Sequence, residues 1–442
     1  MAGTKPAAPP DTMHQSPISP GLSFYEAQLQ AEGIERPRYA PLDGDRHADV
    51  AIVGGGFTGL SCALTLAEAG ADVVLLEASR VGDGASGRNG GQMGTGPRDG
   101  VLALEAEVGR ERARALWDIA EGAKRTLRET AERYQFGIDH VPGQLDVLHK
   151  ASHEREARAG IDALNERYDY PHIHWHDPDD MAERVGSRRY HGGSRDTGTG
   201  HIQPMKYVVG LARAADQVGA QLCEDTPVTK VTMNGTIRLE TPRGTVTASK
   251  VLLALNGTHG DLHPALAAHV LPIQSFIGAT APLPDDTDVL PGFEAVADTR
   301  FMVRYFRKTR DNRLLFGGRE AYGRATPADI ERQIRAQIAE VYPQLADEPL
   351  THAWGGSVGI TTPRLPYVRE LEPGLWTAGG YSGHGVMMSN HTGRLVAEMF
   401  LGESETLRHL AALDVPAFPG GRHLREPIKV AALTWFSLLD RL

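Results

Sequence analysis

Cysteine is nearly absent from this sequence. Only Cys62 and Cys223 occur in 442 residues. Two cysteines so far apart give neither the spacing of a metal site nor a disulfide framework. We therefore expect both to be buried, reduced thiols that take no part in chemistry.

Basic charge is also in deficit. The chain has 46 lysines and arginines against 56 aspartates and glutamates, a net charge of −10, and no basic block stands out. Non-specific electrostatic attraction of such a chain to nucleic acid or to an anionic membrane is not expected. We expect neither partner.

Long apolar runs are missing as well. No segment approaches 18 uninterrupted apolar residues, and the proline-rich start lacks the apolar core of a signal peptide. Hydrophobic residues make up 41% and charged residues 23%, which is typical of a globular protein with two or three domains. A cytoplasmic location is the resulting expectation.

Glycine, in contrast, is frequent, and a cluster of glycines follows the first predicted strand. Residues 47–79 read HADVAIVGGGFTGLSCALTLAEAGADVVLLEAS, which predicts a strand, a tight turn, a helix and a second strand. Gly54, Gly56 and Gly59 match the dinucleotide fingerprint, whose glycines permit the turn, the approach of the pyrophosphate and helix packing. The helix that follows directs its free N–H groups at the phosphates.

An acidic residue completes this pattern. Glu77 ends the second strand, 18 residues after Gly59, near the spacing at which a carboxylate accepts hydrogen bonds from ribose hydroxyls. A carboxylate there would repel a 2′-phosphate, which disfavours NADP. These residues alone do not decide between FAD and NAD.

A second glycine-rich strand-to-helix junction, LWTAGGYSGHGVMMSN, lies more than 300 residues further along. It predicts that the nucleotide-binding domain is discontinuous. We expect an α/β protein with a Rossmann-like nucleotide domain and an α+β substrate domain built on a mixed sheet. The predicted segments are an N-terminal arm (1–46), the nucleotide domain (47–100, 191–270 and 352–415), the substrate domain (101–190 and 271–351) and a C-terminal tail helix (416–442).

Shorter patterns predict individual elements. They indicate a short helix at Phe24–Ala31, a long helix from Leu102 to about Tyr134, a helix at Lys150–Tyr168, separate strands at GTVTAS and KVLLAL, a hairpin turning at Arg310–Asn312, and a helix at Pro327–Tyr342.

Several motifs together resemble the flavin-dependent D-amino-acid oxidase superfamily, and more closely its gamma-glutamylputrescine oxidoreductase branch. The resemblance extends from about Ala48 to Leu442 and rests on VGGGFTGLS, LEASRVGDGASGRNGGQ, TGHIQPMKY, DNRLLFGG, GYSGHGV and FPGGRHLREP. It implies FAD as the bound nucleotide. Covalent members of the superfamily use a ring-side cysteine or histidine, which GRNGGQ lacks, so we expect non-covalent FAD.

The resemblance also implies roles for particular residues. It places Gly54, Gly56 and Gly59 at the pyrophosphate, Glu77 on the ribose, Arg80 near the adenosine end and Val228 at the adenine. It places Ser86, Gly87, Arg88, Asn89, Gly90, Gly91 and Gln92 along the flavin, and Gly380, Ser382, Gly383, Gly385 and Val386 along its pyrimidine side. Helix N-terminal amides at Gly385 and Val386 would stabilise negative charge on the flavin.

Three residues are candidates for the chemistry. His384 would tune the flavin or help oxygen react by placing positive charge beside the ring, although a structural histidine is as reasonable. Tyr305 and Arg307 share one face of a strand and Arg304 lies on the other; either arginine could receive a substrate carboxylate or simply be solvated. Trp354 would line the substrate cavity or fill the core.

Two further patterns are weaker. His172, His174 and His176 share a face if the chain is extended, but surface histidines are frequent and the superfamily chemistry needs no metal, so we expect none. The tail helix Ile428–Leu442 has an apolar stripe without a basic face. This favours docking on its own domain or on a second subunit, which leaves a homo-oligomer open.

The resulting hypothesis is an FAD-dependent oxidase of a primary or secondary amine. Gamma-glutamylputrescine or a related small amine would be converted to imine and aldehyde, with molecular oxygen reduced to hydrogen peroxide. The alternatives are an FAD-dependent dehydrogenase that uses another acceptor, an NAD-dependent dehydrogenase, and a non-catalytic flavin-binding or accessory protein.

Overall fold

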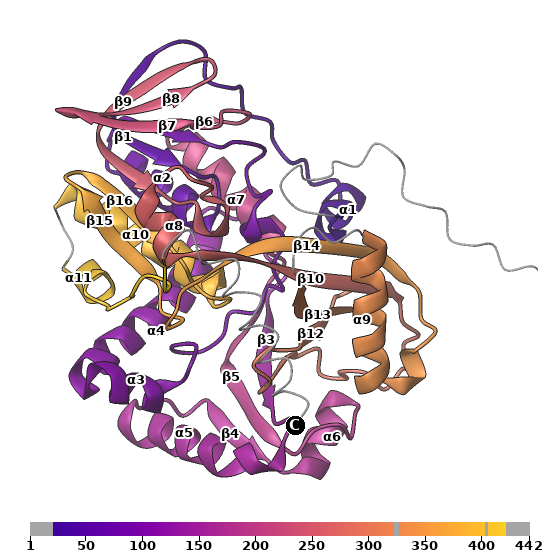
Figure 1. Cartoon of the computed structure of the whole chain (residues 1–442). Coiled ribbons are helices and arrows are strands. Elements are labelled where there is room, and N and C mark those ends of the chain that lie inside the picture. The colour runs from indigo at the N-terminus through magenta and orange to yellow at the C-terminus, as the bar shows by residue number, and fades with distance from the viewer. Residues whose placement is uncertain (1–20, 322–326, 403–404, 421–442) are drawn as a thin grey trace, which may run out of the picture.

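The computed structural model describes residues 21–321, 327–402 and 405–420. The predicted tail helix at Ile428–Leu442 and the first 20 residues of the predicted N-terminal arm lie outside these ranges. Within them, the chain forms two eight-stranded sheets that stand side by side (Figure 1). None of the helices in the described ranges is long and apolar enough to cross a membrane.

The first sheet is mainly parallel and contains both predicted glycine junctions. Its order is β15-β16-β9-β1-β2-β6, with β8 paired to β9 and β7 paired to β8. Val50–Val53 pairs in register with Val73–Leu76, as the β-α-β pattern predicts. The strands are β1 (Arg46–Val53), β2 (Val73–Leu76), β6 (Gln221–Cys223), β7 (Lys230–Asn234), β8 (Thr236–Thr241), β9 (Gly244–Leu253), β15 (Tyr367–Glu372) and β16 (Leu375–Gly379).

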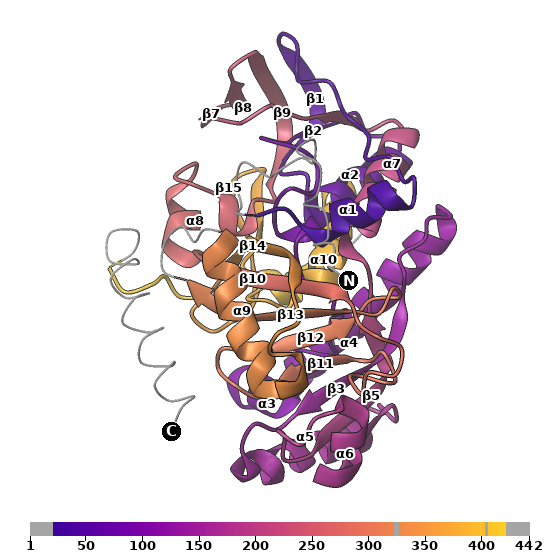
Figure 2. The same cartoon turned by 90° about the vertical axis from the view of Figure 1, so that its right-hand side faces the viewer.

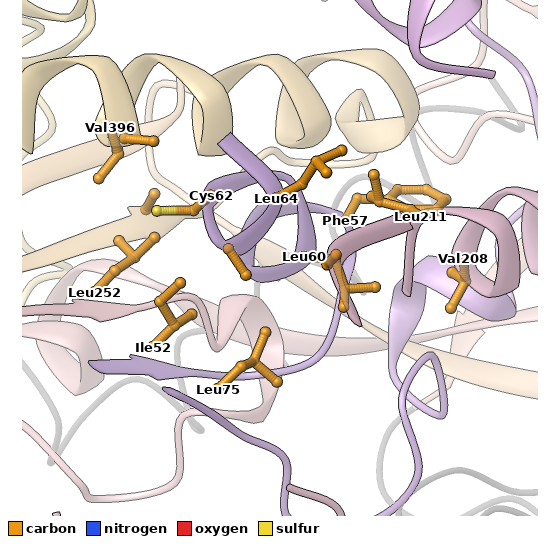
Figure 3. Close-up of a cluster of buried hydrophobic side chains, with 14 of the residues drawn as sticks. Ile52, Phe57, Leu60, Cys62, Leu64, Leu75, Val208, Leu211, Leu252 and Val396 are labelled. Carbon is orange, nitrogen blue, oxygen red and sulfur yellow. The ribbon is translucent and has the colours of Figure 1, made fainter. Parts of the chain in front are cut away.

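Helix α2 (Phe57–Glu68) is the centre of this domain. Ile52, Leu75 and Leu252 of the sheet lie on one side of it, while α7 (Pro204–Gln217) and α10 (Gly385–Leu401) lie on others (Figure 3). The approach of α10 is very close, because a Cβ at Gly393 would lie 2.1 Å from the carbonyl oxygen of Thr58. The second junction therefore packs directly on the first, although more than 300 residues separate the two in sequence.

The second sheet is antiparallel except for β11 and β3, with the order β14-β10-β13-β12-β11-β3-β5-β4. Helix α9 (Pro327–Val341) covers one face, as Figure 2 shows, with Ile330, Ile334 and Ile338 buried there. The strands are β3 (Val141–Val147), β4 (Ile173–His176), β5 (Gly193–His201), β10 (Leu271–Pro282), β11 (Ala295–Asp298), β12 (Tyr305–Lys308), β13 (Arg313–Ala321) and β14 (Leu350–Ile360).

The remaining helices connect or flank the sheets. Their bounds are α1 (Phe24–Ala31), α3 (Val101–Val108), α4 (Arg110–Arg133), α5 (Glu154–Arg167), α6 (Pro178–Val185), α8 (Pro264–His269) and α11 (Leu407–Ala411). The bounds predicted for α1 and the turn predicted for the β12–β13 hairpin are confirmed. The long helix predicted from Leu102 is broken, because Gly109 adopts a left-handed φ of 81° between α3 and α4.

Strand pairing corrects three further expectations. GTVTAS and KVLLAL do not form separate strands, since β9 runs through both. Strand β5 lies within the predicted nucleotide segment 191–270 but pairs with β3 and β4 of the second sheet. Strand β14 falls largely within the predicted segment 352–415 but pairs with β10. Periodicity along the chain identifies a strand, whereas its sheet is decided by contacts far away in sequence.

Candidate active site

A cavity of about 1320 Å³ lies between the two glycine junctions and the face of the second sheet opposite α9. Strands β10, β12 and β14 contribute Ser275, Tyr305 and Val358 to its wall. Most small-molecule pockets measure about 300–1,000 Å³, so this one has room for a dinucleotide and a second small molecule.

The first glycine junction forms one end of the cavity. Gly54 has a φ of 113°, and a Cβ on it would lie 2.6 Å from the carbonyl oxygen of Ala254. A Cβ on Gly56 would lie 2.8 Å from Ser86 Oγ. Gly59 does not line the cavity; its Cβ would lie 2.0 Å from the carbonyl oxygen of Gly54. The first two glycines therefore keep the turn open, and the third lets α2 pack on β1.

Glu77 lies beside this turn and lines the cavity. Its Oε2 accepts a hydrogen bond from the Gly55 amide at 2.7 Å, and its Oε1 accepts one from the Ser79 amide at 2.9 Å. Burial raises the pKa of this carboxyl, although the two amide bonds oppose that shift. Each oxygen keeps acceptor capacity for a ligand hydroxyl.

The predicted flavin loop is fixed by its own polar groups. Ser86 Oγ accepts a hydrogen bond from the Phe57 amide at 2.9 Å, and Asn89 binds the Ala85, Ser86 and Gly91 backbone. Gln92 donates to the Val296 carbonyl at 2.9 Å. Ser86, Arg88, Asn89, Gly90 and Gln92 line the cavity, as does Val228.

Other residues predicted to bind the cofactor lie behind the lining. Gly87 and Gly91 are confined by backbone, since a Cβ would lie 2.4 Å from the Gly82 carbonyl oxygen and 2.1 Å from the Ile202 carbonyl oxygen, respectively. Arg80 also lies outside the lining, and its Nη2 donates to the Arg36 carbonyl at 3.2 Å. Gly87 and Gly91 therefore shape the loop, and the cofactor contacts expected of these three residues stay predictions.

The second glycine junction also lines the cavity. Ser382, Gly383, Gly385 and Val386 line the cavity at the N-terminus of α10, and Gly380 stands just behind them. The amides of a helix N-terminus carry partial positive charge. The Tyr381 hydroxyl lies 2.9 Å from Thr58 Oγ1, which ties this junction to α2.

His384 lies in the lining, but it is not a cation. Its Nε2 lies 2.9 Å from the Gly96 carbonyl oxygen, which can only accept, so Nε2 carries the proton. Burial, followed by the charge of Arg98, lowers the pKa of His384 to about 4. The predicted positive charge at His384 is therefore wrong at neutral pH, and this side chain is a neutral imidazole.

Tyr305 and Arg307 share a strand face, as expected, but only Tyr305 lines the cavity. The Tyr305 hydroxyl lies 3.2 Å from Ser275 Oγ. Arg307 is buried and donates to the carbonyls of Gly90 at 2.6 Å and Ile202 at 3.2 Å and to the Tyr25 hydroxyl at 3.3 Å. The prediction that Arg307 receives a substrate carboxylate is wrong for this arrangement, because its donors already hold the flavin loop.

Two other candidates are also structural. Arg304 is buried and forms an ion pair with Glu340 outside the cavity lining. Trp354 is fully buried, and its indole nitrogen donates to the Arg88 carbonyl at 3.0 Å. Trp354 therefore fills the core rather than walling the cavity.

Among the residues that the structure describes, no cluster of histidine, cysteine or carboxylate side chains could hold a metal ion. His176 lies against Asp180, and His174 is exposed. Both cysteines are buried and unpaired, which confirms their predicted state.

Several polar lining residues were not predicted. Arg98 donates to the Ser382 carbonyl at 2.6 Å, and Gln144, Asp146 and Asp196 line the second-sheet side. The signal for two of them was present, because Gln144 and Asp146 alternate with Leu145 and Val147 in a strand pattern. Nothing in that pattern says that the polar face of the strand borders a cavity.

Comparison with known proteins then decides the family. Residues 49–399 match the family described as DAO, FAD dependent oxidoreductase. The chain belongs to this family. The expected cofactor, FAD, and the expected enzyme class are thereby confirmed, and an NAD-dependent dehydrogenase is excluded.

Two relatives are similar in sequence to this protein along nearly the whole chain. "Probable oxidoreductase OrdL" of Rhizobium meliloti is 54% identical over 97% of this chain and 99% of its own length. Gamma-glutamylputrescine oxidoreductase of Escherichia coli is 36% identical over 92% of this chain and 96% of its own. The solved structure of glycine oxidase from Geobacillus kaustophilus has a TM-score of 0.70 at 22% identity, covering 83% and 99% of the two chains, which confirms the fold.

The residues of the cavity fit FAD. The open turn at Gly54 and Gly56 admits a pyrophosphate at the N-terminus of α2, and Glu77 supplies a carboxylate suited to ribose hydroxyls. The N-terminus of α10 lies in the same lining and supplies a second set of helix N-terminal amides. One chain thus offers donors for both the phosphate and the ring portions of a flavin dinucleotide.

Proposed function

We propose that this protein oxidises a primary or secondary amine, namely gamma-glutamylputrescine or a related small amine, to an imine that water converts to an aldehyde. Molecular oxygen would take the electrons and form hydrogen peroxide. The observation that carries the proposal is the single cavity in which the FAD-binding elements face a second, partly polar wall. The name of the Escherichia coli relative supports the choice of substrate.

The residues of this chain have definable tasks in such a reaction. FAD, when bound, supplies the two-electron acceptor. Apolar side chains of Ile273, Ile277 and Val358 exclude water from the second wall, so that an amine there is held in its neutral form. Neutral His384 and the Tyr305 hydroxyl would orient the amine by hydrogen bonds rather than by charge.

A dehydrogenase that passes its electrons to another acceptor is the second candidate. It is considered because one relative is named dimethylglycine dehydrogenase, while another is named glycine oxidase.

Product analysis separates the two functions. Purified holoenzyme is supplied with gamma-glutamylputrescine in air-saturated buffer, and aldehyde and peroxide are quantified together. Equal amounts of both products support the oxidase. Aldehyde that accumulates only when an artificial electron acceptor is added supports the dehydrogenase.

A further inference from the structure

One strand of the second sheet presents its polar face to the cavity. Along β3, Leu145 and Val147 are buried in the core under α9, whereas Gln144 and Asp146 line the cavity. Asp196 of β5 pairs in register with Gln144, so their side chains lie on the same face as neighbours. These three side chains form a compact polar patch on the wall of the cavity.

This patch carries negative charge, and among the described residues neither Asp146 nor Asp196 forms a direct ion pair, although the charge of Lys124 acts on Asp196. Asp196 is only 1% exposed, and its Oδ1 accepts hydrogen bonds from the Tyr170 hydroxyl at 2.7 Å and the Gly198 amide at 2.8 Å, both uncharged donors. Lys124 reaches Tyr170 as well, at 3.1 Å, but Lys124 is already paired with Glu121 at 2.8 Å.

The arginine next to Asp196 in the sequence is not paired with the carboxylates of this patch. Arg195 points to the other face of β5 and pairs with Glu294 at 2.6 Å. Burial and the charge of Asp196 raise the pKa of Asp146 from 3.8 to about 6, so Asp146 is still largely ionised at neutral pH.

An unsatisfied acceptor points into the same patch. Gln144 is 7% exposed; its Nε2 donates to Asp146 Oδ1 at 2.9 Å, while its Oε1 is buried without a hydrogen-bond partner. The donor to a carboxylate must be the amide nitrogen, so the free atom is the carbonyl oxygen. A buried acceptor left unpaired is costly and uncommon, which indicates that a donor occupies this place when a ligand is bound.

We propose that Gln144, Asp146 and Asp196 form a subsite for an ammonium group of the substrate, remote from the amine that is oxidised. The inference deepens the proposed function and rests on it. The patch offers acceptors and negative charge only, and an ammonium group offers three N–H donors and a positive charge. The substrate class is accordingly a small diamine, one nitrogen of which is oxidised while the other is held as a cation. Such a diamine is one of the related small amines of the proposed function, and differs from gamma-glutamylputrescine, whose second putrescine nitrogen is an uncharged amide.

The test compares a diamine with a monoamine of the same carbon chain. Holoenzymes of the parent, Asp146→Asn and Gln144→Met are mixed anaerobically with 1,4-diaminobutane or n-butylamine, and flavin reduction is followed against amine concentration. Asp146→Asn should raise the half-saturating concentration of the diamine about 10- to 100-fold, since it removes charge-assisted hydrogen bonds. The value for the monoamine should stay within about threefold, and Gln144→Met should act in the same direction.

Asp179→Asn is the control, because Asp179 is an exposed carboxylate paired with Arg188 outside the cavity. Equal effects of Asp146→Asn on the two amines, or no effect on either, would overturn the subsite. If neither amine reduces the flavin, binding of 1,4-diaminobutane is measured by calorimetry. An affinity that falls in Asp146→Asn but not in Asp179→Asn then supports the subsite even though neither amine is oxidised, whereas no binding by the parent, or an unchanged affinity, overturns it.

Discussion

The carboxylate of Glu77 lies 2.7 Å from the Gly55 amide and accepts its hydrogen bond. The residue predicted to bind the ribose therefore also fixes the glycine turn that admits the pyrophosphate. Two parts of the predicted FAD site would then depend on one side chain, and this coupling makes Glu77 a sensitive position for testing cofactor binding.

Glu77→Gln should weaken FAD binding about 10- to 100-fold. The amide replaces one acceptor oxygen with a donor, so at least one charge-assisted hydrogen bond to backbone or ribose is lost. FAD affinity can be measured by fluorescence titration of the apoprotein. Glu224→Gln is the control, because Glu224 is a buried carboxylate that also accepts a backbone hydrogen bond, from the Val81 amide at 2.8 Å, but does not line the cavity. Equal FAD affinity in Glu77→Gln and the parent would remove Glu77 from the site.

Arg307→Lys should reduce FAD retention and stability without altering the choice of substrate. Lysine cannot reproduce the three hydrogen bonds to Gly90, Ile202 and Tyr25, and the loss of one or two costs roughly 1.5 to 3 kcal/mol. The readouts are the FAD dissociation rate and the ratio of activities on amines with and without a carboxylate. A collapse of that ratio at full FAD loading would restore Arg307 as a substrate ligand.

His384 should not titrate in the working pH range. With a pKa of about 4, it stays neutral from pH 5.5 to 9, so any ionisation in the pH profile of flavin reduction should persist in His384→Gln. Stability follows the same logic. The unfolded histidine binds a proton below about pH 6.5 and the folded one resists it, so stability should fall as the pH drops from 6.5 toward 4.

His352→Gln is the control for this test, since burial also lowers the pKa of His352 to about 4 but His352 lies outside the cavity lining. Both variants should flatten the fall in stability below pH 6.5. Loss of a kinetic pKa between 6 and 8 in His384→Gln alone would show that His384 does carry the charge.

Gly385→Pro should slow flavin reduction more than it weakens substrate binding. Gly385 is the first residue of α10, where proline deletes one N–H donor facing the cavity. Removing one donor from a site of developing negative charge costs about 2.7 to 4 kcal/mol, a hundred- to a thousandfold in rate. Gly385→Ala keeps the donor, and its Cβ would meet Tyr381 Cβ at a tight but tolerable 3.3 Å. Similar rates in both FAD-loaded variants would exclude a role for this amide.

Local patterns predicted much of the fold. The first β-α-β unit, α1, the β12–β13 hairpin and the junction before α10 follow from periodicity and glycine placement within short windows. The sheet assignments of β5 and β14 did not follow, because a strand pairs with partners that its own sequence does not specify.

The site, like the fold, was predictable only in part. Glu77 and Ser86 line the cavity. Their places were predictable because each belongs to a contiguous sequence motif. The alternation of side chains along the strand placed Arg307 on the correct strand face. Its hydrogen-bond partners, the carbonyls of Gly90 and Ile202, belong to segments far away in sequence. The neutral state of His384 depends on burial by the fold and on Arg98, neither of which appears in the local sequence.

The most direct test of the account is anaerobic stopped-flow reduction of the bound flavin by gamma-glutamylputrescine and a panel of small primary and secondary amines. We predict rapid, saturable bleaching of the oxidised flavin by at least one of them, with one aldehyde formed per flavin. A holoenzyme fully loaded with FAD that remains oxidised with every amine in the panel would contradict the proposed function.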